Sequence, residues 1–481
     1  MPPPADVIHE QGLHHQLTAG QMTMVAVGGS IGTGLLLGSA AALEQAGPAV
    51  ILCYIIAAFI AYTVAMALGE LASMHPAAGS FGLYGELYLN QYLGFLCRSA
   101  YWAAIAFSIG AELVASATYM SYWLPAVPSD VWVVVFSALL LLVNLGNVGS
   151  YGRFEFWFSM IKLATIIAFI LAGAALLSSG RVIPQYTAHG GFFPKGPIAP
   201  LLAVFWAIYA FGGIEMLAVT TGESHSPKDF PRATRLTFLL LAGTYLGAIT
   251  VLAGVIPWNH TGVSESPFVS VLRLAHIPAA AYFMNFVVLT AALSGANAKL
   301  YAASRLLFSM GRTGWAQAAL GKLNAAGSPR VALLVSSYGI VSTLIINHWA
   351  PKQAFVYIMG AAFSGLIFSW VVSLAAHVSF RRRLTPQQLA ALPMHSPLGI
   401  WGSMIGFVLA SATVLHTLFA TRVNAIGGLS FLTALTVAYV LLKRRRAKTY
   451  PVLKSRSTIE ADGLGPWTHS ATSLQDVGRL G

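Results

Sequence analysis

Three ionisable side chains lie deep inside long apolar stretches of this 481-residue chain. Lys162 falls within the stretch over residues 154–178, and Glu112 lies in the middle of the stretch over residues 94–121. Glu215 follows two glycines in a third apolar stretch. Stretches of this length can cross a bilayer as helices. Charged groups at such depth are costly, and they mark ion pathways, proton relays or substrate sites.

Lys162 is the candidate for proton coupling. As a helical residue at ~1.5 Å of rise per position, it lies too far from the membrane surface for its side chain to reach water. We therefore expect it to face the interior of the helix bundle. Burial there disfavours the charged ammonium, so the amine can release its proton near neutral pH. The alternative is a permanently charged lysine that binds carbonyl groups of a broken helix.

The acidic residues leave several roles open. Glu112 can contact a substrate amine, relay a proton, pair with a buried cation, or serve only as a polar packing contact. For Glu215 we favour a gating or structural role at a helix break over direct substrate contact. We expect Lys299 to reach the membrane surface, and Glu70 to make a contact at a helix end.

Two glycine-rich interruptions suggest where these groups act. The first divides the apolar stretch over residues 21–43, and the second covers residues 210–215. Lipid cannot satisfy freed backbone groups, so broken helices occur only where they line an internal cavity. A close helix–helix packing motif such as Gly34-x-x-x-Gly38 is the alternative explanation. The first interruption contains Gly28, Gly29, Ser30, Gly32, Thr33 and Gly34.

The composition requires an integral membrane protein, because 57% of the residues are hydrophobic and only 9% are charged. Twelve apolar stretches predict an all-α membrane protein with twelve transmembrane helices. The interruptions fall in the first and sixth, which cross in opposite directions, as a five-plus-five inverted repeat requires. The predicted organisation is an N-terminal tail over 1–20, a first repeat over 21–178, a second repeat over 199–378, two further helices over 399–442 and a C-terminal tail over 443–481.

Charge placement predicts the orientation. About 20 Lys and Arg fall on one side of the predicted spans and about 5 on the other, which puts both termini in the cytoplasm. The net charge of +12 is distributed over short loops and the end of the last span, so we expect no nucleic-acid partner. No cofactor, metal site or catalytic activity is expected either, and the oligomeric state stays open.

Several segments together resemble the amino acid–polyamine–organocation superfamily, and within it the bacterial amino acid transporters for GABA, lysine, aromatic amino acids and glycine. The resemblance covers about residues 12–445. The segments are LTAGQMTMVAVGGSIGTGLLLGSA (17–40), ALGELASMHPAAGSF (67–81), FEFWFSMIKLATIIAFI (154–170), FGGIEMLAVTTGES (211–224) and PRATR (231–235).

The resemblance implies a multi-pass protein of the bacterial inner membrane that imports amino acids with protons and has broken helices 1 and 6. It implies that the substrate carboxylate binds Ser30, Ile31, Gly32, Thr33 and Gly34, and that the amine meets carbonyl groups that include those of Ala210, Phe211 and Gly213. Helix ends offer the same partners, N–H groups for an anion and carbonyl groups for a cation.

We expect neutral amino acids as substrates, with Glu112 the feature that would favour cationic ones. A cationic amino acid permease or an amino acid exchanger on the same fold is the alternative. An amino acid sensor is a remote one.

Overall fold

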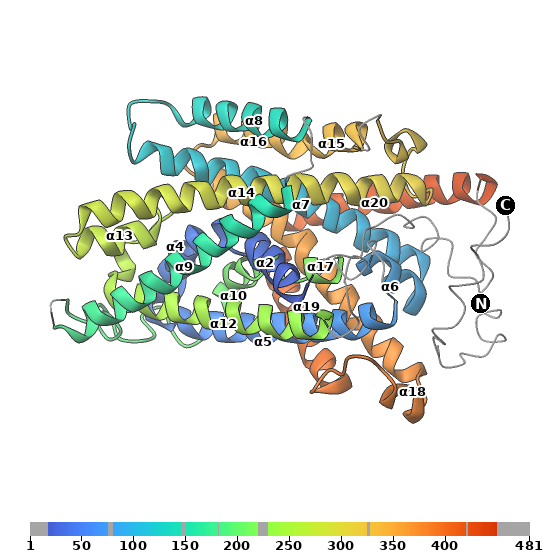
Figure 1. The fold of residues 1–481 in the computed structure, drawn as a ribbon, viewed down its shortest axis with the longest axis horizontal. Coiled ribbons are helices and arrows are strands. Elements are labelled where there is room, and N and C mark those ends of the chain that lie inside the picture. The colour runs from blue at the N-terminus through green and yellow to red at the C-terminus, as the bar shows by residue number, and fades with distance from the viewer. Residues whose placement is uncertain are drawn as a thin grey trace.

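The computed structural model describes residues 18–75, 80–145, 151–180, 182–219, 229–324, 328–419 and 422–449. Every regular element in these ranges is a helix (Figure 1). Nine of these helices are long and apolar enough to cross a membrane, and two shorter apolar helices accompany them. The described residues therefore form an all-helical, multi-pass architecture. The count of twelve spans and the inverted repeat stay predictions.

The helices follow the apolar stretches of the sequence. In chain order they are α2 (Ala19–Ser30), α3 (Thr33–Leu36), α4 (Gly38–Ala46), α5 (Val50–Met74), α6 (Ser80–Tyr88), α7 (Gln91–Ser121), α8 (Ser129–Leu145), α9 (Tyr151–Ser178), α10 (Ala199–Ala210), α11 (Met216–Val219), α12 (Asp229–Val255), α13 (Pro267–Leu274), α14 (Pro278–Arg312), α15 (Arg330–Ser336), α16 (Tyr338–Trp349), α17 (Ala354–Arg383), α18 (Pro386–Ala390), α19 (Gly399–Phe419) and α20 (Arg422–Thr449).

The first glycine-rich interruption separates α2 from α3. Helix α2 begins with a capping box, in which the Thr18 hydroxyl accepts from the Gln21 N–H and the Gln21 side chain accepts from the Thr18 N–H. It ends at Ser30, and Ile31 and Gly32 are extended before α3 begins. The break leaves the last carbonyl groups of α2 and the first N–H groups of α3 without helical partners.

The second interruption separates α10 from α11. Helix α10 ends at Ala210, and the residues up to Glu215 form turns before α11 begins. Gly213 adopts a φ of +110°, a conformation that side-chain-bearing residues rarely take. The glycine is therefore required for the backbone path of this break.

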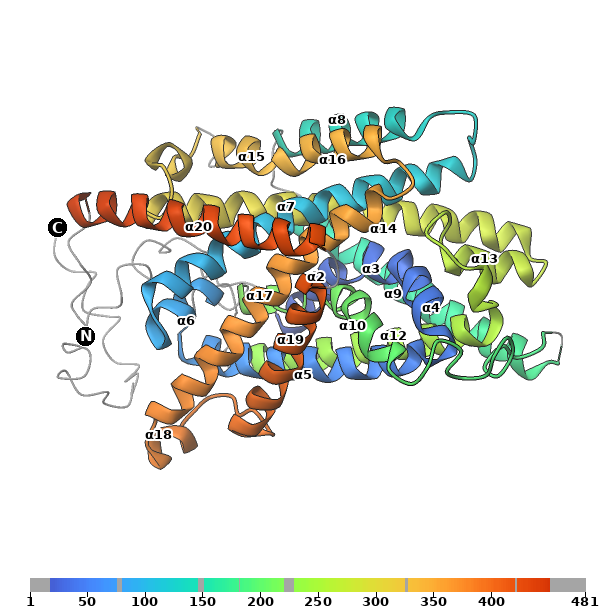
Figure 2. The same cartoon turned by 180° about the vertical axis from the view of Figure 1, so that it is seen from behind.

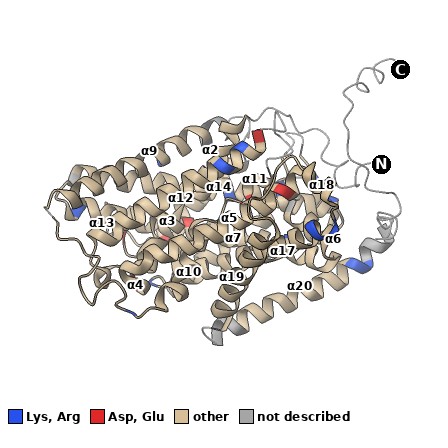
Figure 3. Cartoon of the chain, turned by 90° about the horizontal axis from the view of Figure 1, so that it is seen from below, with Lys and Arg blue, Asp and Glu red and all other residues tan. Residues whose placement is uncertain are grey.

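The broken helices lie inside the bundle. Figures 1 and 2 show long helices running along the molecule, with α8 and α16 side by side on one outer face. Several apolar side chains of α8 are about half exposed or more, which fits contact with lipid. Figure 3 shows long uncharged stretches of ribbon, with basic residues near the end of α20. The interior position of the breaks agrees with the rule that irregular backbone must be covered by protein.

Candidate functional site

The two helix breaks pack directly against each other. A Cβ atom added to Gly34 would lie 2.8 Å from the Ala210 Cα atom, and one added to Gly213 would lie 2.8 Å from the Ser30 Oγ atom. Only glycine allows approaches this close. Residues about 180 positions apart in the chain are thus brought into contact, while their use as a substrate site stays a prediction.

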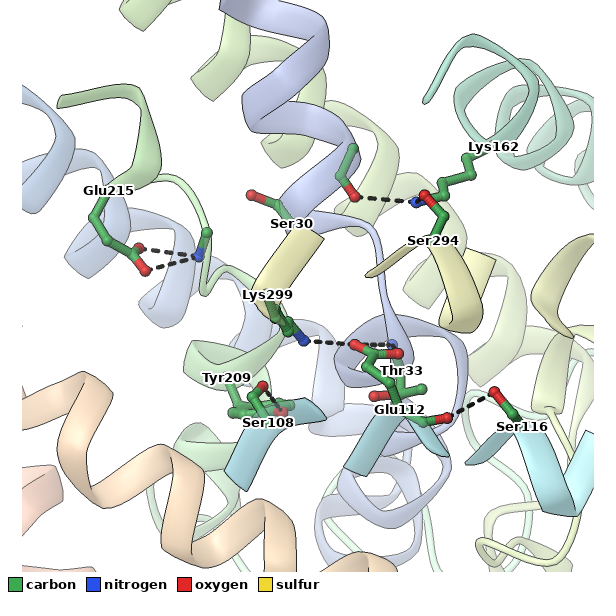
Figure 4. Close-up of polar contacts among 12 residues, drawn as sticks. Ser30, Thr33, Ser108, Glu112, Ser116, Lys162, Tyr209, Glu215, Ser294 and Lys299 are labelled. Atoms are coloured by element: carbon green, nitrogen blue, oxygen red, sulfur yellow. Dashed lines mark hydrogen bonds and ion pairs between the residues drawn. The ribbon is translucent and has the colours of Figure 1, made fainter. Parts of the chain in front are cut away.

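Glu112 of α7 reaches the first break (Figure 4). Its carboxylate accepts a hydrogen bond from the Thr33 N–H, with Oε2 3.2 Å from the nitrogen, and its Oε1 lies 2.6 Å from the Lys299 ammonium. The Glu112 side chain is fully buried. The predicted pairing of Glu112 with a buried cation is therefore one of its roles in the structure.

The expectation that Lys299 reaches the membrane surface is wrong. Helix α14 continues to Arg312, which places Lys299 about 20 Å from its end at ~1.5 Å per residue. The Lys299 side chain is only 20% exposed, and its ammonium also lies 5.9 Å from the centroid of the Tyr209 ring. Attraction to the Glu112 carboxylate holds it at the break because a buried charge without a partner is costly.

Lys162 of α9 joins three helices. Its ammonium donates to the Gly28 carbonyl oxygen at 3.1 Å and to the Ser294 hydroxyl at 3.2 Å (Figure 4). Gly28 lies in the last turn of α2, where carbonyl groups lack intrahelical partners. The side chain faces the interior, as predicted, and it binds the broken first helix. Its part in proton coupling stays a prediction.

Glu215 folds back onto the second break. Its carboxylate accepts from the Gly213 N–H at 3.0 and 3.1 Å, from the Tyr101 hydroxyl at 2.8 Å and from the Trp370 indole N–H at 3.3 Å. The side chain is buried. These contacts hold unwound backbone between α7 and α17, which agrees with the structural role favoured from the sequence.

The other residues predicted to bind substrate use their polar groups in local hydrogen bonds or pack their rings in the interior. The Ser30 hydroxyl donates to the Ala26 carbonyl, and the Ser30 carbonyl accepts from the Tyr245 hydroxyl. The Ile31 N–H donates to a carbonyl of α2, so it caps the helix. The Phe211 ring is buried, with its centroid 4.9 Å from that of Tyr245.

The carbonyl groups proposed for the substrate amine are partly used by local turns. The Phe211 carbonyl accepts from the Ile214 N–H at 3.3 Å, and the Gly213 carbonyl accepts from the Met216 N–H at 3.0 Å. A carbonyl oxygen has a second lone pair, so each can still accept another donor. Both groups therefore remain candidates for an ammonium.

Glu70 makes buried contacts with two other helices near the end of α5. It is fully buried, and its carboxylate accepts two hydrogen bonds from Arg381, at 2.7 and 2.8 Å. It also contacts the His377 ring, whose other nitrogen lies 2.7 Å from the Ser403 hydroxyl. The residue joins α5 to α17 and, through His377, to α19; it lies four residues from the end of α5, and Arg381 lies in the last turn of α17, so the contact is made near helix ends, as expected.

Several residues of the site escape the sequence reasoning. Tyr101, Ser294 and Trp370 are common packing residues in apolar helices, and nothing in their spacing marks them. Lys299 carried a usable signal, because charge within a long apolar helix indicates function. The hydrophobic pattern does not show that the helix continues to Arg312, and this continuation sets the depth of Lys299.

The site offers partners for a zwitterion. The N–H group of Thr33 suits an anion, and carbonyl groups of both breaks suit a cation. Within the described residues there is no group of three or more His, Cys, Asp or Glu side chains that could hold a metal ion.

Comparison with known proteins agrees with this architecture. The sequence profile of the amino acid permease family matches residues 21–444. The chain is 33% identical to the uncharacterized amino acid permease YtnA of Bacillus subtilis (strain 168), over 89% of this chain and 95% of the relative. It is 35% identical to the aromatic amino acid transport protein AroP of Escherichia coli (strain K12), over 82% of this chain and 88% of the relative. A chain with apolar helices, two paired breaks and this match therefore belongs to the amino acid permease family, within the amino acid–polyamine–organocation superfamily.

Proposed function

We propose that the protein imports neutral amino acids by proton symport across a bacterial inner membrane, with both termini in the cytoplasm. Membership of a permease family makes it an amino acid transporter, and the proposal concerns its substrates and its coupling ion. The orientation rests on the distribution of Lys and Arg.

The observation that carries the coupling proposal is the bond between Lys162 and Gly28. An ammonium occupies the end of the broken helix, where its charge serves as a bound cation would. Loss of one proton would remove that charge and release α2 from α9. This arrangement supports proton coupling over sodium coupling as the proposal.

The proposal of neutral substrates rests on charge balance. Glu112 was the feature that favoured a cationic side chain, and its charge is paired with Lys299 at 2.6 Å. The pair adds no net charge to the break, so a substrate with a neutral side chain needs no further counter-ion. The AroP relatives are named as aromatic amino acid transport proteins, which puts phenylalanine, tyrosine and tryptophan first among the neutral candidates.

Competition measures the substrate class. Uptake of labelled L-phenylalanine into cells that express the protein is challenged with each of the other amino acids in excess. We expect neutral amino acids to compete best, with aromatic ones first. Stronger competition by lysine or arginine would contradict the proposed class and restore Glu112 as a receptor for a cationic side chain. Counterflow that ignores the proton gradient would instead favour an exchanger.

A further inference from the structure

A carboxylate already occupies the place where the substrate carboxylate is expected. Glu112 comes from α7, yet its oxygens lie on the Thr33 N–H at the start of α3, 3.2 and 3.4 Å from the nitrogen (Figure 4). Thr33 belongs to the broken segment to which the resemblance assigns the substrate carboxylate, and its N–H is a donor to such a group. The acidic side chain thus uses a group that the substrate needs.

The surroundings fit a carboxylate closely. A Cβ atom added to Gly32 would lie 2.5 Å from Glu112 Oε1, and one added to Gly295 of α14 would lie 3.3 Å from Glu112 Cδ. The two glycines, one in the first break and one in α14, form a notch around the carboxylate group. Lys299 adds a positive charge at 2.6 Å. Two positions without side chains and the Thr33 N–H together make a receptor for one carboxylate, and the Lys299 ammonium balances the charge of the carboxylate that fills it.

One donor in the notch is left over. The Thr33 hydroxyl is buried, and among the described residues it has no hydrogen-bond partner. Buried hydroxyl groups are normally paired, so the Thr33 hydroxyl is a donor that a ligand could use. A ligand carboxylate at this position could accept from both the Thr33 N–H and the Thr33 hydroxyl, whereas Glu112 uses only the former.

We propose that Glu112 is a tethered competitor of the substrate, which holds the carboxylate receptor until an amino acid displaces it. The inference rests on the proposed function, since it assumes that an amino acid binds at the break. Two carboxylates cannot share the notch without strong repulsion. The Glu112–Lys299 pair moves aside as a neutral unit, because separating the two buried charges would leave one unpaired. Lys299 is thereby a positioning residue that determines when the receptor is free.

The test compares two ligands that differ only at the carboxylate, L-phenylalanine and L-phenylalaninol. Binding of each to the purified protein is measured by calorimetry for the parent, for Glu112→Gln and for the double variant Glu112→Gln/Lys299→Gln. We expect Glu112→Gln to lower the Kd for L-phenylalanine by ~10-fold, the value of a hydrogen bond to a charged group. The Kd for L-phenylalaninol should stay unchanged, because this ligand does not use the receptor.

The double variant keeps the test independent of an unpaired lysine. It removes the competitor and the buried ammonium together, and it should still bind L-phenylalanine more tightly than the parent does. Unchanged or weaker binding of L-phenylalanine by both variants would overturn the inference. Weaker binding of both ligands would show that Glu112 receives the substrate amine. Absence of binding of all twenty amino acids to the parent would refute the proposed function itself, and this inference would fall with it.

Discussion

The Lys162 ammonium donates to the Gly28 carbonyl oxygen at 3.1 Å, and this bond ties α9 to the end of the broken helix α2. The same ammonium donates to the Ser294 hydroxyl of α14. One side chain therefore holds together three helices around the first break. A proton that leaves Lys162 would weaken both bonds at once, which gives a physical link between protonation and the position of α2.

Lys162→Ala should reduce concentrative uptake and its pH dependence more than it reduces binding. Alanine removes the tie, while the groups that face the substrate stay in place. Lys162→Arg is the matched control, because arginine keeps the charge but cannot lose its proton. It should bind substrate and fail to accumulate it. Proton-driven accumulation by Lys162→Ala at the parental level between pH 5 and 8 would show that the lysine is only structural.

Gly34→Ala should abolish transport. The new Cβ atom would lie 2.8 Å from the Ala210 Cα atom, and backbone atoms cannot move aside as a flexible side chain can. Overpacking of this kind costs about 1–3 kcal/mol. Gly29→Ala is the control, since a Cβ at Gly29 meets nothing within 4 Å. Uptake of a radiolabelled amino acid measures both variants, and equal losses in the two would argue against the packing of the breaks.

Glu215→Gln should destabilise the substrate-free protein. An amide retains one acceptor oxygen, so the bonds from Gly213, Tyr101 and Trp370 cannot all be kept. Leaving buried donors unsatisfied costs about 1–3 kcal/mol. Thermal unfolding in detergent without substrate measures the effect. If the unfolding midpoint is unchanged and only substrate affinity falls, Glu215 contacts the substrate instead of supporting the break.

His75 supplies a pH effect on stability that is separate from transport. It lies just after α5, and its ring contacts the Tyr88 hydroxyl at 2.5 Å. Burial lowers the pKa of His75 to about 4 from its usual 6.5. Between these values the unfolded chain binds the proton and the folded chain does not, so stability falls as pH drops from 6.5 toward 4.

His75→Gln should flatten this loss of stability in acid. Glutamine can still pair with the Tyr88 hydroxyl, but it does not titrate. The unfolding midpoint of the variant, measured from pH 7 to pH 5, should therefore change less than that of the parent. The pH profile of uptake should not change. A variant whose midpoint falls as steeply as that of the parent would mean that other groups bind the protons.

The sequence predicts the breaks because their physics is local. Glycines clustered in a membrane-length stretch are costly in a helix and indicate an interruption, and both interruptions occur where expected. Lys162 is predicted to face inward from its depth alone, which depends only on helix geometry. These features need no knowledge of how the helices are arranged.

Contacts between distant helices could not be predicted in this way. The pairing of Glu112 with Lys299 joins α7 to α14, and it depends on the rotation of both helices and on the true end of α14 at Arg312. The capping of Gly213 by Glu215 needs the local turn geometry, which hydrophobic patterning does not give.

Proton-driven uptake into proteoliposomes tests the central claim most directly. The purified protein is reconstituted in sodium-free buffer, and uptake of labelled L-phenylalanine and L-alanine is followed with an inward proton gradient, without one, and after a protonophore. The account predicts accumulation of at least one of these neutral amino acids above equilibrium only while the gradient exists. Uptake that never exceeds equilibrium, or that requires an amino acid inside and ignores the gradient, would contradict it.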